Sequence, residues 1–91
     1  LSGTGRWAEA LARADVAIPQ ARALGLRTLL PRLLVWTGLV HRGLGDLERA
    51  RLLVDEAWAL AAARPDDVHA VVPAHTGMAG VLVTAGEHRR A

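Results

Sequence analysis

A glycine followed by an aspartate, at Gly45 and Asp46, separates two stretches of helical hydrophobic spacing in the middle of the chain. Glycine readily adopts the left-handed conformation that ends many helices. An aspartate in the next position accepts hydrogen bonds from the free N–H groups at the start of a following helix. This dipeptide therefore predicts a tight turn between two helices that run in opposite directions.

Each stretch beside this turn carries an apolar stripe. After the turn, apolar residues recur every three or four positions, at Leu47, Ala50, Val54, Ala57, Trp58 and Ala61, and charged residues take the other side, at Asp46, Glu48, Arg49, Arg51, Asp55 and Glu56. Before the turn, the segment is apolar almost all round, and such a helix is usually covered on more than one side. The small residues Gly38 and Ala50 are expected to meet across the hairpin.

The turn pattern recurs along the chain. Gly5 lies 40 residues before Gly45, and Gly86 lies 41 residues after it. The positions after Gly5 also match those after Gly45, with Trp7, Ala10 and Ala17 in the places of Leu47, Ala50 and Ala57. Recurrence at a fixed period is the mark of a repeat architecture. Repeat turns are therefore predicted near Gly5, Gly45 and Gly86.

This set of small and large positions resembles the tetratricopeptide repeat. The residues that carry the resemblance span the whole central hairpin and are Gly38, Gly45, Leu47, Ala50 and Ala57. The resemblance implies an all-α fold of antiparallel helix pairs stacked as an α-solenoid. About two repeats plus partial ends would form a single domain or fragment over residues 1–91. The period exceeds the roughly 34 residues of tetratricopeptide repeats and overlaps the roughly 40 to 47 residues of other helical-pair repeats.

Helix limits follow from glycines, caps and prolines. The predicted helices run over about residues 5–24, from a cap at Thr28 to the turn at Gly45, from Asp46 to near Arg64, and over about 72–85. Gly25 is expected to end the first helix, and Pro31 fits the first turn of the second, where no backbone N–H is needed. Pro19 and Pro73 each either kink or break a helix, because proline removes a backbone hydrogen bond.

Composition excludes several classes of protein. Arginine is the only cationic residue apart from histidine, so a pI near 11.0 arises from a net charge of only +2. Arginines alternate with acidic residues, whereas a nucleic-acid surface gathers charges of one sign. No direct contact with nucleic acid is therefore expected. The absence of cysteine excludes disulfides and thiolate metal sites and fits a cytoplasmic setting.

One uncharged segment is long enough to be considered as a membrane span. Residues 68–86 carry no formal charge. The segment contains Pro73, two histidines and several glycines, and its apolar residues are mostly small, so insertion into a bilayer would be poorly driven. A buried helix is the expected structure, and no membrane contact is predicted. The first ten residues lack the basic and apolar regions of a signal peptide.

Residues capable of chemistry are sparse. Ser2 is the only serine, and no acidic residue stands in a recognisable arrangement with a histidine or serine. His41, His69, His75 and His88 lack the spacing of helical metal ligands. Trp7, Trp36 and Trp58 are expected to fill gaps between helices. No catalytic, metal or cofactor site is predicted, and the chain is not expected to be an enzyme.

The candidate binding surface follows from the family resemblance. In tetratricopeptide-like stacks, the first helix of each pair lines a concave groove, which implies lining by Arg32, Val35, Leu39 and Arg42 from one repeat and by Pro73, Thr76, Gly80 and Val83 from the next. The family's carboxylate clamp uses lysines and asparagines, and this chain contains neither. A largely apolar groove with two arginines suits an amphipathic helix from a protein partner or from another domain of the same protein.

Long helix pairs rich in alanine, leucine and arginine also resemble the sensor arms of large bacterial regulators, including LuxR-type activators with an ATPase module. The expected function is a non-enzymatic module for protein–protein interaction within a bacterial signalling or transcription-regulating protein. The alternative is a small-ligand sensor domain, which would require an enclosed polar pocket around Arg32 and Arg42. An open apolar trough would favour the interaction module.

Incomplete repeats at both ends lead to a further expectation. Trp7, Leu11 and Ile18 at one end, and Val81 and Leu82 at the other, would lack covering helices. Exposed apolar patches of this kind are typical of interaction sites. The chain is therefore expected to form homo-oligomers in solution.

Overall fold

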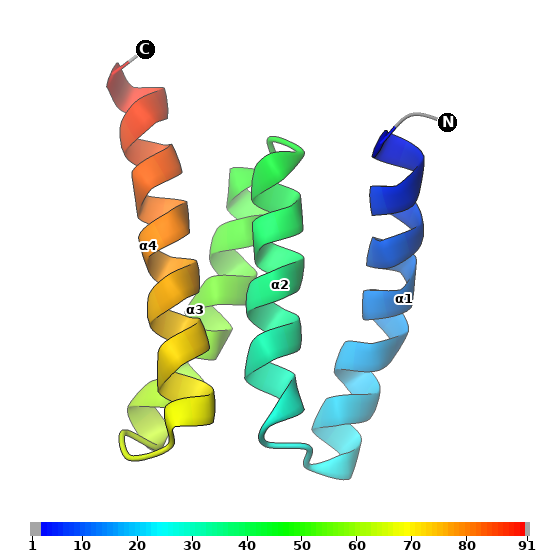
Figure 1. The fold of residues 1–91 in the computed structure, drawn as a ribbon, viewed down its shortest axis with the longest axis vertical. Helices are drawn as coiled ribbons and strands as arrows, with labels where there is room; N and C mark the ends of the chain where they lie inside the picture. Colours follow the sequence, from blue (N-terminus) through cyan, green and yellow to red (C-terminus); the bar gives the residue numbers. More distant parts are fainter. Residues whose placement is uncertain (1–2, 91) are drawn as a thin grey trace.

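Four helices make up the described part of the chain, and Figure 1 shows their arrangement. The computed structural model describes the backbone of residues 3–90 and the side chains of residues 5–87. The helices are α1 (Gly3–Leu24), α2 (Leu29–Gly43), α3 (Leu47–Ala63) and α4 (Val68–Arg90). Successive helices run in opposite directions. The predicted all-α class and the succession of antiparallel helices are confirmed.

The turn between α2 and α3 is confirmed in detail. Gly45 has a φ of +88°, and its N–H donates to the carbonyl oxygen of Arg42 at 3.0 Å. The Asp46 carboxylate accepts from the backbone N–H of Arg49 at 3.1 Å, as an N-cap does. Gly25, with a φ of +65°, ends α1 in the same manner. Local glycine chemistry therefore fixes two of the three connections.

The other two predicted repeat turns are wrong. Gly5 lies inside α1 and Gly86 inside α4. Within the described residues, only Gly25 and Gly45 have positive φ. A glycine forces no turn by itself, and in a helix interior it costs only about 1 kcal/mol relative to alanine. Gly45 is followed by the capping residue Asp46, whereas Arg6 follows Gly5 and Glu87 follows Gly86.

Neither proline breaks its helix. Helix α1 continues through Pro19, and α4 continues through Pro73. The carbonyl groups that lose a partner belong to the residues four positions earlier, Asp15 and His69. Both of these residues are exposed, so water can satisfy their carbonyls. In Figure 1 the lower half of α1 leans toward the foot of α2.

One helix start and one capping bond differ from expectation. Helix α4 begins at Val68 rather than near Val72, because the Asp67 carboxylate accepts from the His69 N–H at 3.0 Å and the Asp67 carbonyl accepts from the N–H groups of Ala70 and Val71. Thr28 occupies the N-cap position of α2 but makes no capping bond through its side chain. Pro31 lies in the first turn of α2, as predicted, and is buried.

Helix α2 is the centre of the packing. It packs against α1, α3 and α4, and α3 also packs against α4. The main core is formed by small and branched side chains from all four helices, namely Ala14, Ile18, Leu34, Val35, Ala57, Ala61, Ala70 and Ala74. A second cluster of Ala50, Val54 and Val81 joins the upper ends of α3 and α4. The central hairpin thus supplies six of these eleven residues, and α1 and α4 supply the other five.

Glycines set the distances between α2 and its neighbours. A Cβ atom placed on Gly38 would lie 3.2 Å from the Ala50 carbonyl oxygen, so the predicted contact of Gly38 with Ala50 is confirmed. A Cβ on Gly77 would lie 2.9 Å from Val35 Cγ1 and 3.1 Å from Cγ2. A Cβ on Gly80 would lie 2.7 Å from Arg42 Nη1. The α2–α4 contact therefore depends on glycine at 77 more than at 80.

The variants Gly77→Ala and Gly80→Ala are expected to shift stability in opposite directions. Both gain up to about 1 kcal/mol of helix propensity. At Gly77 the new methyl meets both methyls of the stiff Val35 side chain, and overpacking of about 1 to 3 kcal/mol reverses that gain. At Gly80 the guanidinium end of Arg42 can move away. Urea unfolding measures both changes, and equal shifts would show that α2 and α4 do not approach at Gly77.

Candidate functional site

Part of the predicted concave groove lies in a helix–helix contact instead. Val35 is 5 % exposed and packs in the core. Leu39 and Arg42 are half-buried, and their side chains lie against Gly80 of α4. The prediction that Val35, Leu39 and Arg42 together line one concave groove is therefore wrong. They face the neighbouring helix because α2 and α4 pack directly on one another.

The remaining predicted residues do not converge. Arg32 on α2 and Thr76 and Val83 on α4 are exposed, and the Thr76 hydroxyl donates to the Val72 carbonyl of its own helix at 3.0 Å. Pro73 is half-buried within α4. None of these four residues lines any of the hollows described below. The enclosed polar pocket that a sensor would need around Arg32 and Arg42 is not found among these hollows.

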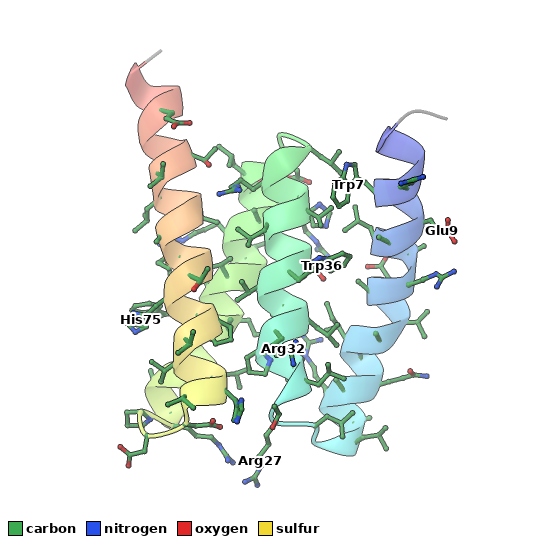
Figure 2. The ribbon with its side chains drawn as sticks, viewed as in Figure 1. Trp7, Glu9, Arg27, Arg32, Trp36 and His75 are labelled. Atoms are coloured by element: carbon green, nitrogen blue, oxygen red, sulfur yellow. The ribbon has the colours of Figure 1, made fainter. Side chains whose placement is uncertain are left out.

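An open apolar groove lies instead between the upper halves of α1 and α2. Its volume is about 350 Å³, and it is lined by Trp7 of α1 and by Trp36, Leu39, Val40, Gly43 and Leu44 from α2 and its C-cap. Figure 2 shows the Trp7 and Trp36 side chains in the space between the two helices. We call these six residues the tryptophan groove. Leu39 alone belongs both to the groove and to the predicted site.

The tryptophan groove exposes unusually large apolar side chains. Trp7 is 46 % exposed, and Trp36 and Leu44 are each 44 % exposed. The prediction that these tryptophans fill gaps between helices is therefore wrong in part, because about half of each ring faces solvent. The available signal was the apolar circumference of α2, which has more apolar surface than three neighbours can cover. Tryptophan is also among the residues enriched at binding hot spots.

A second aromatic feature lies between α3 and α4. The rings of Trp58 and His75 are 4.8 Å apart and tilted by 53°. They border an apolar hollow of about 280 Å³ together with Ala61, Ala62, Pro65 and Val71. The aromatic pair lines this hollow, and the distance between its ring centroids is typical of packed aromatic rings.

Charged groups in the described residues form separate pairs rather than a reactive cluster. Arg13 pairs with Glu9, Arg51 with Asp55, and Arg22 with Glu56. His41 Nδ1 lies 3.9 Å from Asp46 Oδ2 beside the turn. In residues 5–87, no three histidine or acidic side chains come together in a way that could hold a metal ion. His88 lies outside the described side chains.

Helix α4 is more exposed than predicted. Over Val68–Glu87 it is long and apolar enough to cross a membrane by length and composition, and only 22 % of its most apolar window is buried. The expectation of a buried helix is therefore wrong. One face, with Ala70, Ala74 and Val81, packs on the core, and the opposite face exposes Val68, Val72 and Val83.

Comparison with known proteins identifies no relative. The chain matches no protein-family model, no curated protein and no solved structure.

Proposed function

We propose that this chain is a non-enzymatic, helical-repeat module that mediates protein–protein interaction by receiving an amphipathic helix in the tryptophan groove. Its setting would be a larger bacterial protein of signalling or transcription regulation in the cytoplasm. The order of packing supports a stacked arrangement, since α2 and α4 lie side by side and both pack on α3. The tetratricopeptide-like spacing of the central hairpin supports the same assignment.

The observation that carries the proposal is the pair of half-exposed tryptophans over an open apolar floor. Apolar surface of this kind is unfavourable in contact with water. A partner that covers it gains about 25 cal/mol of binding free energy for each square ångström of apolar surface removed from solvent. Large rigid side chains of this type lose little conformational entropy on binding. The groove therefore offers apolar binding energy to a partner that covers both indole rings.

The dimensions of the groove favour a helix as the occupant. The lining positions 36, 39, 40, 43 and 44 follow helical spacing along one edge of α2. They extend for about 12 Å, which corresponds to roughly two turns. A helix with apolar residues at i, i+3, i+4 and i+7 presents a ridge of that length. A small ligand would instead require walls that enclose most of its surface.

A fluorescence titration tests this proposal. The probe is a helical peptide of about 18 residues, made of leucine, glutamate, lysine and alanine, with its leucines in one stripe. In a Trp58→Phe background the emission comes only from Trp7 and Trp36. The striped peptide is expected to shift this emission to shorter wavelength, because it displaces water from both indoles. A peptide of the same composition with scattered leucines is the control.

Variants locate the binding site. Leu44→Glu places a charge in the groove and is expected to weaken binding at least about tenfold. Leu52→Glu makes the same change at a 61 % exposed position on α3, outside the groove, and should leave binding unchanged. Equal affinity of the two variants, or equal response to the two peptides, would refute docking in the tryptophan groove.

We also propose that the chain self-associates. This proposal rests on the exposed face of α4 and not on the tryptophan groove. Of the residues predicted to lack cover, Ile18 and Val81 are buried, at 7 % and 2 % exposure. Trp7 and Leu82 are exposed, at 46 % and 48 %. The exposed face of α4 supports pairing with a second copy. Sedimentation velocity is expected to show oligomers, and a stable 9.7 kDa monomer at high micromolar concentration would contradict this proposal.

A further inference from the structure

A separate hollow lies at the foot of the molecule, where the end of α1, the start of α2, the end of α3 and the start of α4 meet. Its volume is about 140 Å³. The lining residues come from all four helices and their connections. Figure 2 shows Arg27 below the ends of the helices. We call this space the foot hollow.

The interior of the foot hollow is apolar. Ala21 and Ala70 are 1 % and 2 % exposed, and Pro31 is also fully buried, so these small residues form the floor. Leu26, Leu30 and Leu60 form the walls. Apolar walls offer few hydrogen bonds to water in this space. A short hydrocarbon chain suits this interior better than water does.

The rim of the foot hollow carries excess positive charge. Arg22, Arg27 and Arg64 line it together with a single acid, Asp67. The Asp67 carboxylate is already engaged, because it accepts from the His69 N–H at the start of α4. Arg22 Nε donates to Glu56 Oε2 at 3.0 Å, and Nη2 donates to Oε1, which leaves Nη1 available. Within the described residues, neither Arg27 nor Arg64 takes part in an ion pair.

We propose that the foot hollow binds a small aliphatic carboxylate. The hydrocarbon chain would lie on the alanine and proline floor, and the carboxylate would accept hydrogen bonds from Arg27 and Arg64 at the rim. Charge-assisted hydrogen bonds from arginine to a carboxylate are among the strongest that proteins make. Inorganic anions lack the apolar part that the floor would cover, and a cationic or neutral chain lacks the charge that the rim would neutralise.

Three probes of equal chain length separate these contributions. Octanoate, octanol and octylammonium are titrated into the protein, and the methyl resonances of Ala21 and Ala70 report occupancy of the floor. Octanoate is expected to bind at least about tenfold more tightly than octanol, because the alcohol lacks a charge to pair with the arginines. Octylammonium is expected to bind most weakly.

Variants of exposed residues test the rim without disturbing the core. Arg27→Glu combined with Arg64→Glu is expected to weaken octanoate binding at least about tenfold and to strengthen octylammonium binding. Arg49→Glu makes the same charge reversal near the opposite end of α3. It should leave the affinities for octanoate and octylammonium unchanged. Circular dichroism confirms that each variant retains its helices.

Three results would overturn the proposal. The first is equal binding of octanoate and octanol, which would leave an apolar hollow without anion recognition. The second is an unchanged octanoate affinity in the Arg27→Glu, Arg64→Glu variant. The third is tighter binding of a tripeptide that ends in a free leucine carboxylate, which would replace the small acid by a chain terminus. Loss of this site would leave the tryptophan groove and its peptide titration unaffected.

Discussion

Replacing Leu34 with alanine is expected to lower the free energy of unfolding by about 2 to 5 kcal/mol. Leu34 is 0 % exposed and is the largest of the fully buried side chains. It lies on α2, the helix that packs against all three others, and contributes to the main core. Truncation removes buried methyl groups and leaves a cavity that close-packed neighbours cannot fill. Urea unfolding followed by circular dichroism measures the change.

An exposed leucine provides the matched control for this substitution. Leu52 on α3 is 61 % exposed, so Leu52→Ala removes the same atoms from a position where they are mostly in water. Its effect should remain below about 0.5 kcal/mol. Total stabilities of small domains are about 5 to 15 kcal/mol, so Leu34→Ala would remove a large share. Comparable losses at both positions would mean that Leu34 is not in the core.

Overpacking at Ala50 should produce the second-largest loss of stability. Ala50 is 0 % exposed, and its carbonyl oxygen faces Gly38 across the α2–α3 hairpin. Its side chain packs with Val54 and Val81 in the second core cluster. A leucine at this position has no space to enter, so Ala50→Leu should destabilise the fold by about 1 to 3 kcal/mol. Thermal and urea unfolding both report the effect.

Glu48 serves as the reference position on the same helix. It is exposed in the first turn of α3, so Glu48→Ala should change stability by less than about 0.5 kcal/mol. Similar effects at positions 48 and 50 would contradict the assignment of the buried face of α3.

Where backbone chemistry is local, the fold could be predicted from the sequence. Gly45 with Asp46 predicts a left-handed glycine and a capped helix, and both are observed. Gly25 ends α1 with a positive φ, and Pro31 occupies the first turn of α2, where no backbone N–H is needed. The wide apolar surface of α2 correctly indicated a helix with several neighbours, because apolar residues on every side must be covered.

The errors arose where longer-range packing decides the outcome. Gly86 recurs at the period of the repeat, but nothing beside it stops α4, which continues to Arg90. The groove residues were assigned by family resemblance, and the direct contact of α2 with α4 turned Val35 and Leu39 toward Gly77 and Gly80 instead. The spacing of residues along one helix does not reveal how close the next helix comes.

The same limit explains why the tryptophan groove was missed. Trp7 and Trp36 belong to helices whose stripes predict burial. In the structure the backbone of α1 comes close to that of α2 alone, and the groove beside these tryptophans is lined only by residues of α1 and of α2 with its C-cap. Only the arrangement of whole helices leaves both rings about half exposed.

Intermolecular nuclear Overhauser effects between the striped peptide and the protein provide the most direct test of helix docking in the tryptophan groove. Such effects report protons within about van der Waals contact distance and therefore locate the peptide without any variant. We expect contacts from the leucine methyls of the peptide to the indole rings of Trp7 and Trp36, and none to Trp58. Contacts to Trp58 alone, or an absence of contacts to all three indoles at saturating peptide, would contradict docking in the groove.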